Sequence, residues 1–312
     1  MKSFAFVFPG QGSQSVGMLD AWGEHPEVVK TLREASAALG EDVAKLIHEG
    51  PKETLALTTN TQPVMLVAGV AAYRVWMAET GVAPVAVAGH SLGEYSALVA
   101  AGVLTLSQAV PLVRLRAQAM QEAVPVGTGA MAAILGLDAT KVREVCATVS
   151  QASGEVAEAV NFNDPGQTVI AGSKAGVEQA CEALKAAGAK RALPLPVSAP
   201  FHSSLMKPAA EKLKLKLAEV EFKTPQIPLV NNIDVAVETN VDRIRDALYR
   251  QAYGPVRWVE CVQALKASGV TNIVECGPGK VLAGMVKRID AELTGLPLFD
   301  PATLAEVKTA LA

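Results

Sequence analysis

Residues 89–93 read GHSLG, which matches the pattern GxSxG and can present a serine hydroxyl as a nucleophile. An apolar strand is expected over 85–88, directly before this segment, and a helix over 93–101, directly after it. In such a strand–turn–helix the glycines permit a tight turn that lifts Ser91 above the edge of the sheet. The backbone N–H of Leu92, at the start of the helix, can then bond an oxyanion developing on an attacked carbonyl group. An ordinary glycine-rich strand–helix turn is the alternative.

Four histidines are available to activate this serine, because a serine needs a base to become a nucleophile. His25 and His48 lie among charged residues on expected helix surfaces. His90 is adjacent to Ser91 in a tight turn, so its side chain is expected to diverge. His202 follows a strand in a loop that opens a helix, where rigid scaffolds place catalytic groups. His202 is therefore the candidate base, and a plain surface histidine is the alternative.

No carboxylate completes a catalytic triad at an obvious position, so a backbone carbonyl is the candidate for orienting His202. Gln251, at the end of a helix expected over 242–253, is one residue that can place such a carbonyl. The turn GQGSQ at 10–14 follows the first strand and lacks the GxxxxGK[ST] and GxGxxG phosphate-binding patterns. The N–H of Gln11 is a candidate second donor to an oxyanion, with a plain turn as the alternative.

Arg116 stands on an otherwise apolar helical face. Leu112, Arg116 and Met120 recur at a spacing of four residues, so they share one side of a helix expected to begin at a cap on Ser107. A buried guanidinium is costly unless it is paired. Two partners are equally open from the sequence: an internal Asp or Glu, or the carboxylate of a substrate held by bidentate hydrogen bonds.

The elements that must position these residues alternate between short apolar runs and longer helical patterns, which is typical of an α/β fold with a mainly parallel sheet. Over 126–197 the expected order becomes strand–helix–strand–strand–helix–strand, the pattern of a ferredoxin-like unit. We therefore predict a discontinuous large domain, 1–125 plus 198–312, with residues 126–197 as a small inserted subdomain.

Composition narrows the class of protein. Of 312 residues 50% are hydrophobic and 19% charged, which excludes intrinsic disorder. Lys and Arg number 28 against 31 Asp and Glu, and a net charge of −3 is unsuited to coating nucleic acid. No run of about 18 apolar residues predicts a membrane span. Four cysteines without a CxxC pair indicate neither a metal site nor a redox motif, and they predict a cytoplasmic protein.

Seven segments carry a family resemblance in order and in spacing over nearly the whole chain. They read PGQGSQ at 9–14, GHSLGEYSAL at 89–98, RLRAQAM at 114–120, NFNDPGQTVIAG at 161–172, APFH at 199–202, QAYGPVRW at 251–258 and ECGPGKVL at 275–282. Together they resemble the malonyl-CoA:acyl carrier protein transacylases of bacterial fatty-acid synthesis, which are related to polyketide acyltransferase domains. The resemblance implies an α/β-hydrolase-like large domain carrying a ferredoxin-like insert.

The resemblance also implies a role for each candidate residue. Ser91 would be the acylated nucleophile and His202 its base, with Gln251 orienting His202 through its carbonyl. The N–H groups of Gln11 and Leu92 would form the oxyanion hole. Arg116 would bind the free carboxylate of malonate, and Phe201 resembles the residue of malonyl-selective members. Further substrate contacts are implied for His90, Met120, Asn163 and Gln167.

The implied reaction has two halves, in which malonyl-CoA acylates Ser91 and the phosphopantetheine thiol of acyl carrier protein then takes the malonyl group. No metal or bound cofactor, no nucleic acid and no membrane is expected to take part, and the chain is expected to be a monomer. The carrier proteins of this family are acidic, so a local basic patch is expected. Its candidate residues are Lys190, Arg191, Lys280 and Lys287. A serine hydrolase and an inactive carrier-binding scaffold are the alternative functions.

Overall fold

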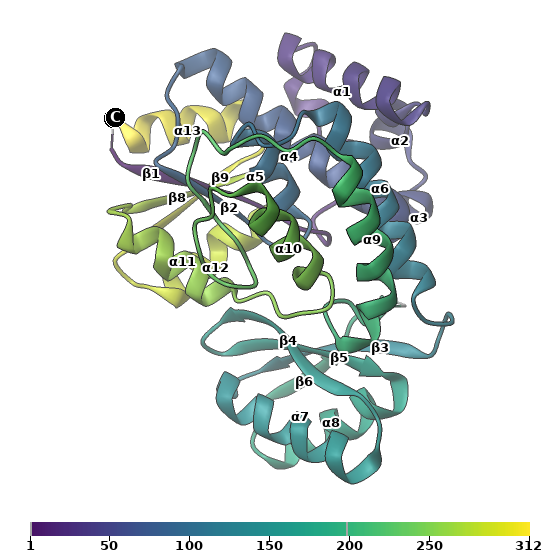
Figure 1. The fold of residues 1–312 in the computed structure, drawn as a ribbon. Helices are drawn as coiled ribbons and strands as arrows, with labels where there is room; N and C mark the ends of the chain where they lie inside the picture. Colours follow the sequence, from purple (N-terminus) through teal and green to yellow (C-terminus); the bar gives the residue numbers. More distant parts are fainter. Residues whose placement is uncertain (1, 198) are drawn as a thin grey trace.

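A five-stranded parallel sheet forms the centre of the larger part of the molecule (Figure 1). The computed structural model describes residues 2–197 and 199–312. The strands lie in the order β7, β2, β1, β8 and β9, and all neighbours are parallel. Their bounds are β1 Phe4–Phe8, β2 Ala86–Gly89, β7 Leu229–Val230, β8 Asn272–Cys276 and β9 Thr294–Leu298. The mainly parallel sheet expected from the sequence is confirmed.

Helices cover both faces of this sheet, and β1 shows why. Phe4, Phe6 and Phe8 point to one face and Ala5 and Val7 to the other, because successive side chains of a strand alternate. The phenylalanine face packs against helices α1 Pro26–Leu39, α4 Thr58–Thr80, α5 Gly93–Ala100, α6 Leu106–Glu122 and α13 Pro301–Leu311. The opposite face packs against α11 Trp258–Ala267 and α12 Val281–Ile289.

A separate four-stranded antiparallel sheet lies below the large sheet in Figure 1. Its order is β4, β5, β3 and β6, and two helices cover its outer face. The bounds are β3 Gly129–Leu135, α7 Ala139–Ser153, β4 Ala157–Asp164, β5 Gln167–Ser173, α8 Lys174–Ala186 and β6 Arg191–Pro194. This is the ferredoxin-like order that the sequence indicates. The exact domain limits stay a prediction, and the limit at Ser198 lies outside the described residues.

Helices α4 and α6 begin earlier than the sequence predicts. A helix is expected over 63–77, but α4 begins at Thr58, because the surface buried by its 23 residues outweighs the single hydrogen bond that an internal proline removes. The cap expected at Ser107 is Thr105 instead. Its hydroxyl accepts the N–H of Gln108 while the Gln108 side chain accepts the N–H of Thr105, a reciprocal box that satisfies two helix-end donors.

Other helices were not expected or end differently from the prediction. Short helices α2 Val43–Glu49 and α3 Lys52–Leu55 give too few residues for a helical period to be recognised in sequence. The sequence predicts one helix over 203–220. The structure divides it into a 3₁₀ turn, Ser204–Met206, and helix α9, Lys207–Glu219, because Pro208 suits only a first helical turn. Helix α10, Val241–Gln251, ends two residues early.

Two further observations concern the whole described chain. Among residues 2–197 and 199–312, no helix combines the length and the apolarity needed to cross a membrane. All four cysteines are free and buried, with the packing of small core residues.

Candidate active site

Ser91 occupies the sharp turn between β2 and α5. Its φ of 53° lies in the left-handed region, which is strained for any residue with a side chain. Asn232 holds the turn from both sides: its Oδ1 accepts the Ser91 N–H at 2.8 Å, and its Nδ2 donates to the carbonyl of Gly89 at 2.7 Å. The flanking glycine is required, because a Cβ on Gly93 would lie 2.1 Å from the carbonyl oxygen of Phe8.

His202 approaches Ser91 from the loop before α9. Its Nε2 lies 2.6 Å from the Ser91 Oγ, and its Nδ1 lies 2.8 Å from the main-chain oxygen of Gln251. Because a carbonyl oxygen only accepts, Nδ1 carries the proton and Nε2 is free to accept the serine proton. Burial, with an added effect of the Arg116 charge, lowers the pKa of His202 to about 3. The ring is therefore neutral at neutral pH, and its Nε2 lone pair faces the serine hydroxyl.

Arg116 reaches the same point from α6, and its side chain is 2% exposed. One terminal nitrogen donates to Gln62 Oε1 at 2.5 Å. The other donates to Gln251 Oε1 at 3.0 Å and to Ser91 Oγ at 3.2 Å. These acceptors are all neutral, and within the described residues Arg116 makes no salt bridge. The internal Asp or Glu partner that the sequence left open is therefore not in contact with it.

Gln62 is a site residue that sequence reasoning missed. It lies buried in helix α4, and the available signal was an amide directly before the apolar run that begins at Pro63. Besides accepting from Arg116, it donates through Nε2 to Thr58 Oγ1 at 3.1 Å. Thr58 in turn donates to Gln11 Oε1 at 2.9 Å, which links the turn after β1 to the arginine. The Gln62 amide also lies 3.9 Å from the Met120 sulfur.

Glu94 and Asn232 were also missed. Glu94 follows Ser91 closely in the sequence, but only the fold shows that it is buried and that it contacts Asn232. Glu94 is buried in the first turn of α5. Its Oε2 accepts the Asn232 N–H and the Gln251 side-chain amide, both at 3.0 Å. Burial raises the pKa of Glu94 to about 7, although these two donors and the charge of Arg116 oppose the rise.

His90 points to the smaller sheet instead of to His202. Its Nε2 lies 2.8 Å from Asn163 Oδ1, and Asn163 donates to Gln167 Oε1 at 3.2 Å. This chain of side chains joins the turn before Ser91 to the hairpin between β4 and β5. Phe201, next to His202, is buried in the large apolar cluster that also contains Met120 and Leu92.

The backbone N–H groups of Gln11 and Leu92 are the two proposed oxyanion donors. Leu92 is the residue before α5, so its N–H lies at the positive end of that helix. Among the hydrogen bonds of the described residues, neither N–H has a backbone or side-chain acceptor. Both donors are therefore available to a ligand as far as the described residues are concerned.

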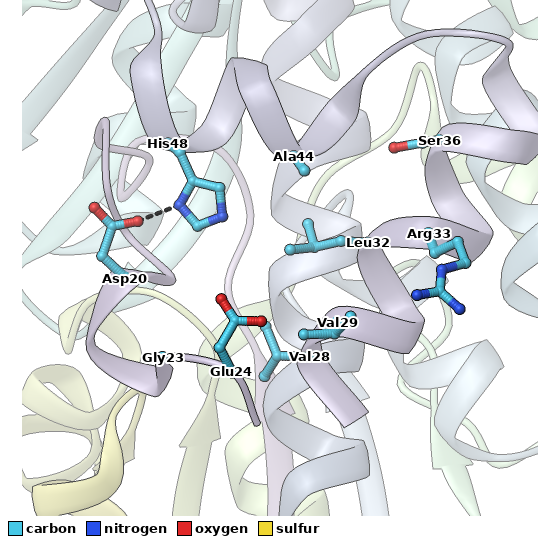
Figure 2. Close-up of a pocket in the computed structure, with 10 residues that line it drawn as sticks. All are labelled: Asp20, Gly23, Glu24, Val28, Val29, Leu32, Arg33, Ser36, Ala44 and His48. Atoms are coloured by element: carbon cyan, nitrogen blue, oxygen red, sulfur yellow. Dashed lines mark hydrogen bonds and ion pairs between the residues drawn. The ribbon is translucent and has the colours of Figure 1, made fainter. Parts of the chain in front are cut away.

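A cavity of about 420 Å³ lies elsewhere, between the 3₁₀ turn Asp20–Trp22, α1 and α2 (Figure 2). Val28, Leu32 and Ala44 line it, and His48 is paired with Asp20 at one side. Neither Ser91, His202 nor Arg116 contributes to its lining. The chemistry of the serine site is thus separate from this cavity.

The protein has an α/β fold with a parallel sheet, and Ser91 lies on a strained strand–helix turn of that fold. A neutral histidine lies against the serine hydroxyl. These features define a protein of the serine-dependent acyl-transfer class. The Acyl transferase domain family matches residues 5–294, and the chain belongs to this family.

The chain is similar to its relatives over nearly their full length. The chain is 57% identical to the malonyl CoA-acyl carrier protein transacylase of Escherichia coli K12 over 98% of both proteins. It is 47% identical to that of Bacillus subtilis, over 97% of this chain and 96% of the relative. The crystal structure of acyl-carrier-protein S-malonyltransferase from Burkholderia pseudomallei is 64% identical, with a TM-score of 0.96 over 99% of this chain and 100% of that one. A type II PKS acyl-carrier protein complex with its malonyl-transacylase contains a similar chain, 52% identical with a TM-score of 0.96 over 99% of each chain.

Proposed function

We propose that this protein transfers the malonyl group of malonyl-CoA to the phosphopantetheine thiol of an acyl carrier protein through a malonyl ester on Ser91. The names of its relatives support this reaction. The observation that carries the substrate class is the buried Arg116 charge, which lies against the Ser91 hydroxyl with only neutral acceptors. A free carboxylate at the far end of the acyl group would supply a counter-charge in direct contact with the guanidinium.

In the first half of the proposed reaction, His202 Nε2 takes the proton as Ser91 Oγ attacks the thioester carbonyl. The N–H groups of Gln11 and Leu92 bond the resulting oxyanion. When the tetrahedral intermediate collapses, the bond to the coenzyme A sulfur breaks. The leaving thiolate takes the proton from His202. The products of this half are a malonyl ester on Ser91 and a neutral His202.

The second half reverses these roles with a different thiol. His202 takes the proton of the carrier's phosphopantetheine thiol, and the sulfur attacks the ester carbonyl. Ser91 leaves and regains its proton from His202. The Gln251 carbonyl holds the Nδ1 proton throughout, so it keeps the tautomer that both halves require.

Other residues receive supporting roles in this proposal. We assign His90, Asn163 and Gln167 to the acyl-donor side, because their hydrogen bonds join the Ser91 turn to the smaller sheet. Met120 and Phe201 are assigned to the apolar wall of the acyl site.

The proposal also covers the location, the oligomeric state and the cofactor requirement of the protein. We infer a cytoplasmic enzyme, which the four free cysteines support. We also infer a monomer that works without a metal or bound cofactor. The elution volume of the purified protein on size exclusion, with light scattering, tests the monomer.

Intact-mass spectrometry of the protein with malonyl-CoA, with and without acyl carrier protein, tests the proposed reaction. A transferase gives an enzyme heavier by one malonyl group and then a malonyl carrier. A hydrolase gives free malonate, and a scaffold gives neither product; either outcome contradicts the proposal. Ser91→Ala is the matched control, because it removes only the attacking oxygen. An adduct that persists in this variant would overturn the assignment of Ser91.

A further inference from the structure

Glu94 lies behind the Ser91 turn and does not contact the Ser91 hydroxyl or His202. Glu94 is 2% exposed, and one of its carboxylate oxygens accepts two hydrogen bonds, from the Asn232 N–H and from the Gln251 side-chain amide. The side chain also borders a small cavity lined by Leu98, Leu229 and Ile244. A buried carboxylate is costly, so its retention here calls for a reason.

The first of these hydrogen bonds acts on the Ser91 turn. The Asn232 backbone N–H is held by Glu94 at 3.0 Å, while the Asn232 side chain bonds the Ser91 N–H and the Gly89 carbonyl. Ser91 is in the left-handed region, which persists only when surrounding contacts enforce it. Glu94 therefore anchors the residue that enforces this conformation.

The second hydrogen bond acts on the base and on the arginine. The Gln251 amide bridges two charged groups: its oxygen accepts from Arg116 at 3.0 Å and its nitrogen donates to Glu94 at 3.0 Å. The same nitrogen donates to the Ser91 carbonyl at 2.9 Å. A reversed amide would set its oxygen against the carboxylate. Since the Gln251 main-chain oxygen holds His202, a fixed Gln251 also fixes the base.

We propose that Glu94 is a positioning residue of the acyl-transfer site, which holds the Ser91 turn through Asn232 and the His202–Arg116 pair through Gln251. The proposal rests on the function proposed above. The role depends on the position of Glu94 Oε2, because this one atom accepts both hydrogen bonds. The charges that act on Glu94 come from several elements: Arg116 on α6 stabilises the carboxylate and Asp234 opposes it.

Two variants separate the effect of the oxygen's position from the effect of its charge. Glu94→Gln keeps an acceptor oxygen at the same distance and removes the charge, whereas Glu94→Asp keeps the charge and withdraws the oxygen by one methylene. We expect the Gln variant to be acylated within about threefold of the wild-type rate. Losing two hydrogen bonds to a buried acceptor should lower kcat of the Asp variant by about 10–100-fold, with KM for malonyl-CoA changed less than about threefold.

Leu98→Ala is the matched structural control, because Leu98 lies one turn further along α5 and lines the same small cavity. It should lower the melting temperature and leave kcat within about threefold of wild type. An Asp variant that acylates at the wild-type rate overturns the proposal. So does a loss of tenfold or more in the Gln variant, an outcome that does not depend on whether the Asp variant folds.

The reaction of Ser91 with phenylmethylsulfonyl fluoride distinguishes this proposal from the proposed function, because the reagent contains no malonyl group. Sulfonylation rates should fall in the same order as acylation rates, from the wild type through Glu94→Gln to Glu94→Asp. If the wild type forms no malonyl ester but sulfonylation follows this order, the proposed function fails and the role of Glu94 stands. If the wild type is malonylated, and the malonylation and sulfonylation rates are the same in the wild type and in both Glu94 variants, the role of Glu94 fails.

Discussion

At the scale of single residues, the site combines a neutral base with a permanent charge. His202 is kept neutral by its burial and by the adjacent guanidinium of Arg116. Arg116 itself is held by amide and hydroxyl oxygens, none of which compensates its charge. The catalytic pair and the specificity of the proposed reaction therefore come from different residues, and they can be tested separately.

Arg116→Ala should lower malonyl transfer by about 10²–10⁴-fold, since breaking a buried ion pair costs roughly 3–5 kcal/mol. Acetyl transfer has no carboxylate to lose and should stay level or rise. The measurement is the malonyl-to-acetyl ratio of acylation rates. Arg114→Ala is the control, because Arg114 is on the same helix but pairs with Glu41. An unchanged ratio in Arg116→Ala would leave this arginine a structural residue.

The acylation rate should show no loss near pH 6.5, the ordinary titration range of histidine. Because the pKa of His202 lies at about 3, its ring stays an acceptor as the pH falls from 8 to 5. Protonated Glu94 keeps an acceptor oxygen, as its glutamine variant does. Rapid-quench measurement of the malonyl ester between pH 5 and 8 tests this. A tenfold fall centred near pH 6.5 would contradict the buried neutral histidine.

The same pKa has a consequence for stability, with a definite sign. As the pH falls below about 6.5, histidine in the unfolded chain gains a proton that buried His202 does not accept until about pH 3. The unfolded state then binds more protons, so His202 lowers the stability of the fold as the pH falls through this window. A His202→Gln variant should therefore lose less stability between pH 7 and 5 than the wild type, as urea unfolding would measure.

At the scale of elements, the turn from β2 to α5 depends on close backbone approach. A Cβ on Gly89 would lie 1.9 Å from the carbonyl of Gly93 and 2.2 Å from the Glu94 nitrogen. These are backbone atoms, so no flexible side chain can move aside. The glycines of the GxSxG pattern are thus needed for packing the helix on the strand as well as for the turn.

Gly89→Ala should destabilise the fold by about 1–3 kcal/mol or more through this overlap. The control is Gly284→Ala in α12, where an added Cβ meets no atom within 4 Å. Gly284→Ala should instead stabilise by about 0.5–1 kcal/mol, because alanine restricts the unfolded chain and favours the helix. Thermal unfolding of both variants is the measurement, and equal melting temperatures would contradict the packing argument.

At the scale of the whole molecule, several contacts tie the smaller sheet to the larger part. Val256 pairs with β4 through two backbone hydrogen bonds, of 2.8 Å and 3.0 Å. Arg288 on α12 bonds Asp164 at the β4–β5 hairpin at 2.8 Å. The His90–Asn163 bond is a third link. In the proposed reaction, the carrier's thiol would therefore reach a Ser91 turn that hydrogen bonds join to the smaller sheet.

The expected basic surface for the carrier is divided between two elements. Lys190 and Arg191 are exposed at the start of edge strand β6, whereas Lys280 and Lys287 are exposed at α12, which contacts β4 at the other edge of that sheet. Affinity for an acidic carrier should weaken from low to high salt. Reversing the charge of each pair separately should show which one steers association. A salt-independent affinity would contradict charge steering altogether.

Local patterns predicted much of the fold. An apolar run and the Gly-Pro-Gly turn after it predict a strand over 272–276 and a helix over 281–289, and strand β8 and helix α12 have these bounds. The strand–turn–helix around Ser91 was predicted for the same reason. Helices α2 and α3 were not, since four to seven residues carry too little periodicity.

The sequence by itself determined which groups are reactive and which faces are buried, because periodicity and turn residues act over a few neighbours. Only the tertiary structure decided which groups meet. Arg116 meets Gln62 across 54 positions, Glu94 meets Asn232 across 138, and Gln251 meets Glu94 across 157. A hydrogen bond requires atoms about 3 Å apart in a set direction, and strand order and loop paths fix that geometry. Local spacing shows that Arg116 faces inward, but only the folded chain shows that neutral acceptors surround it.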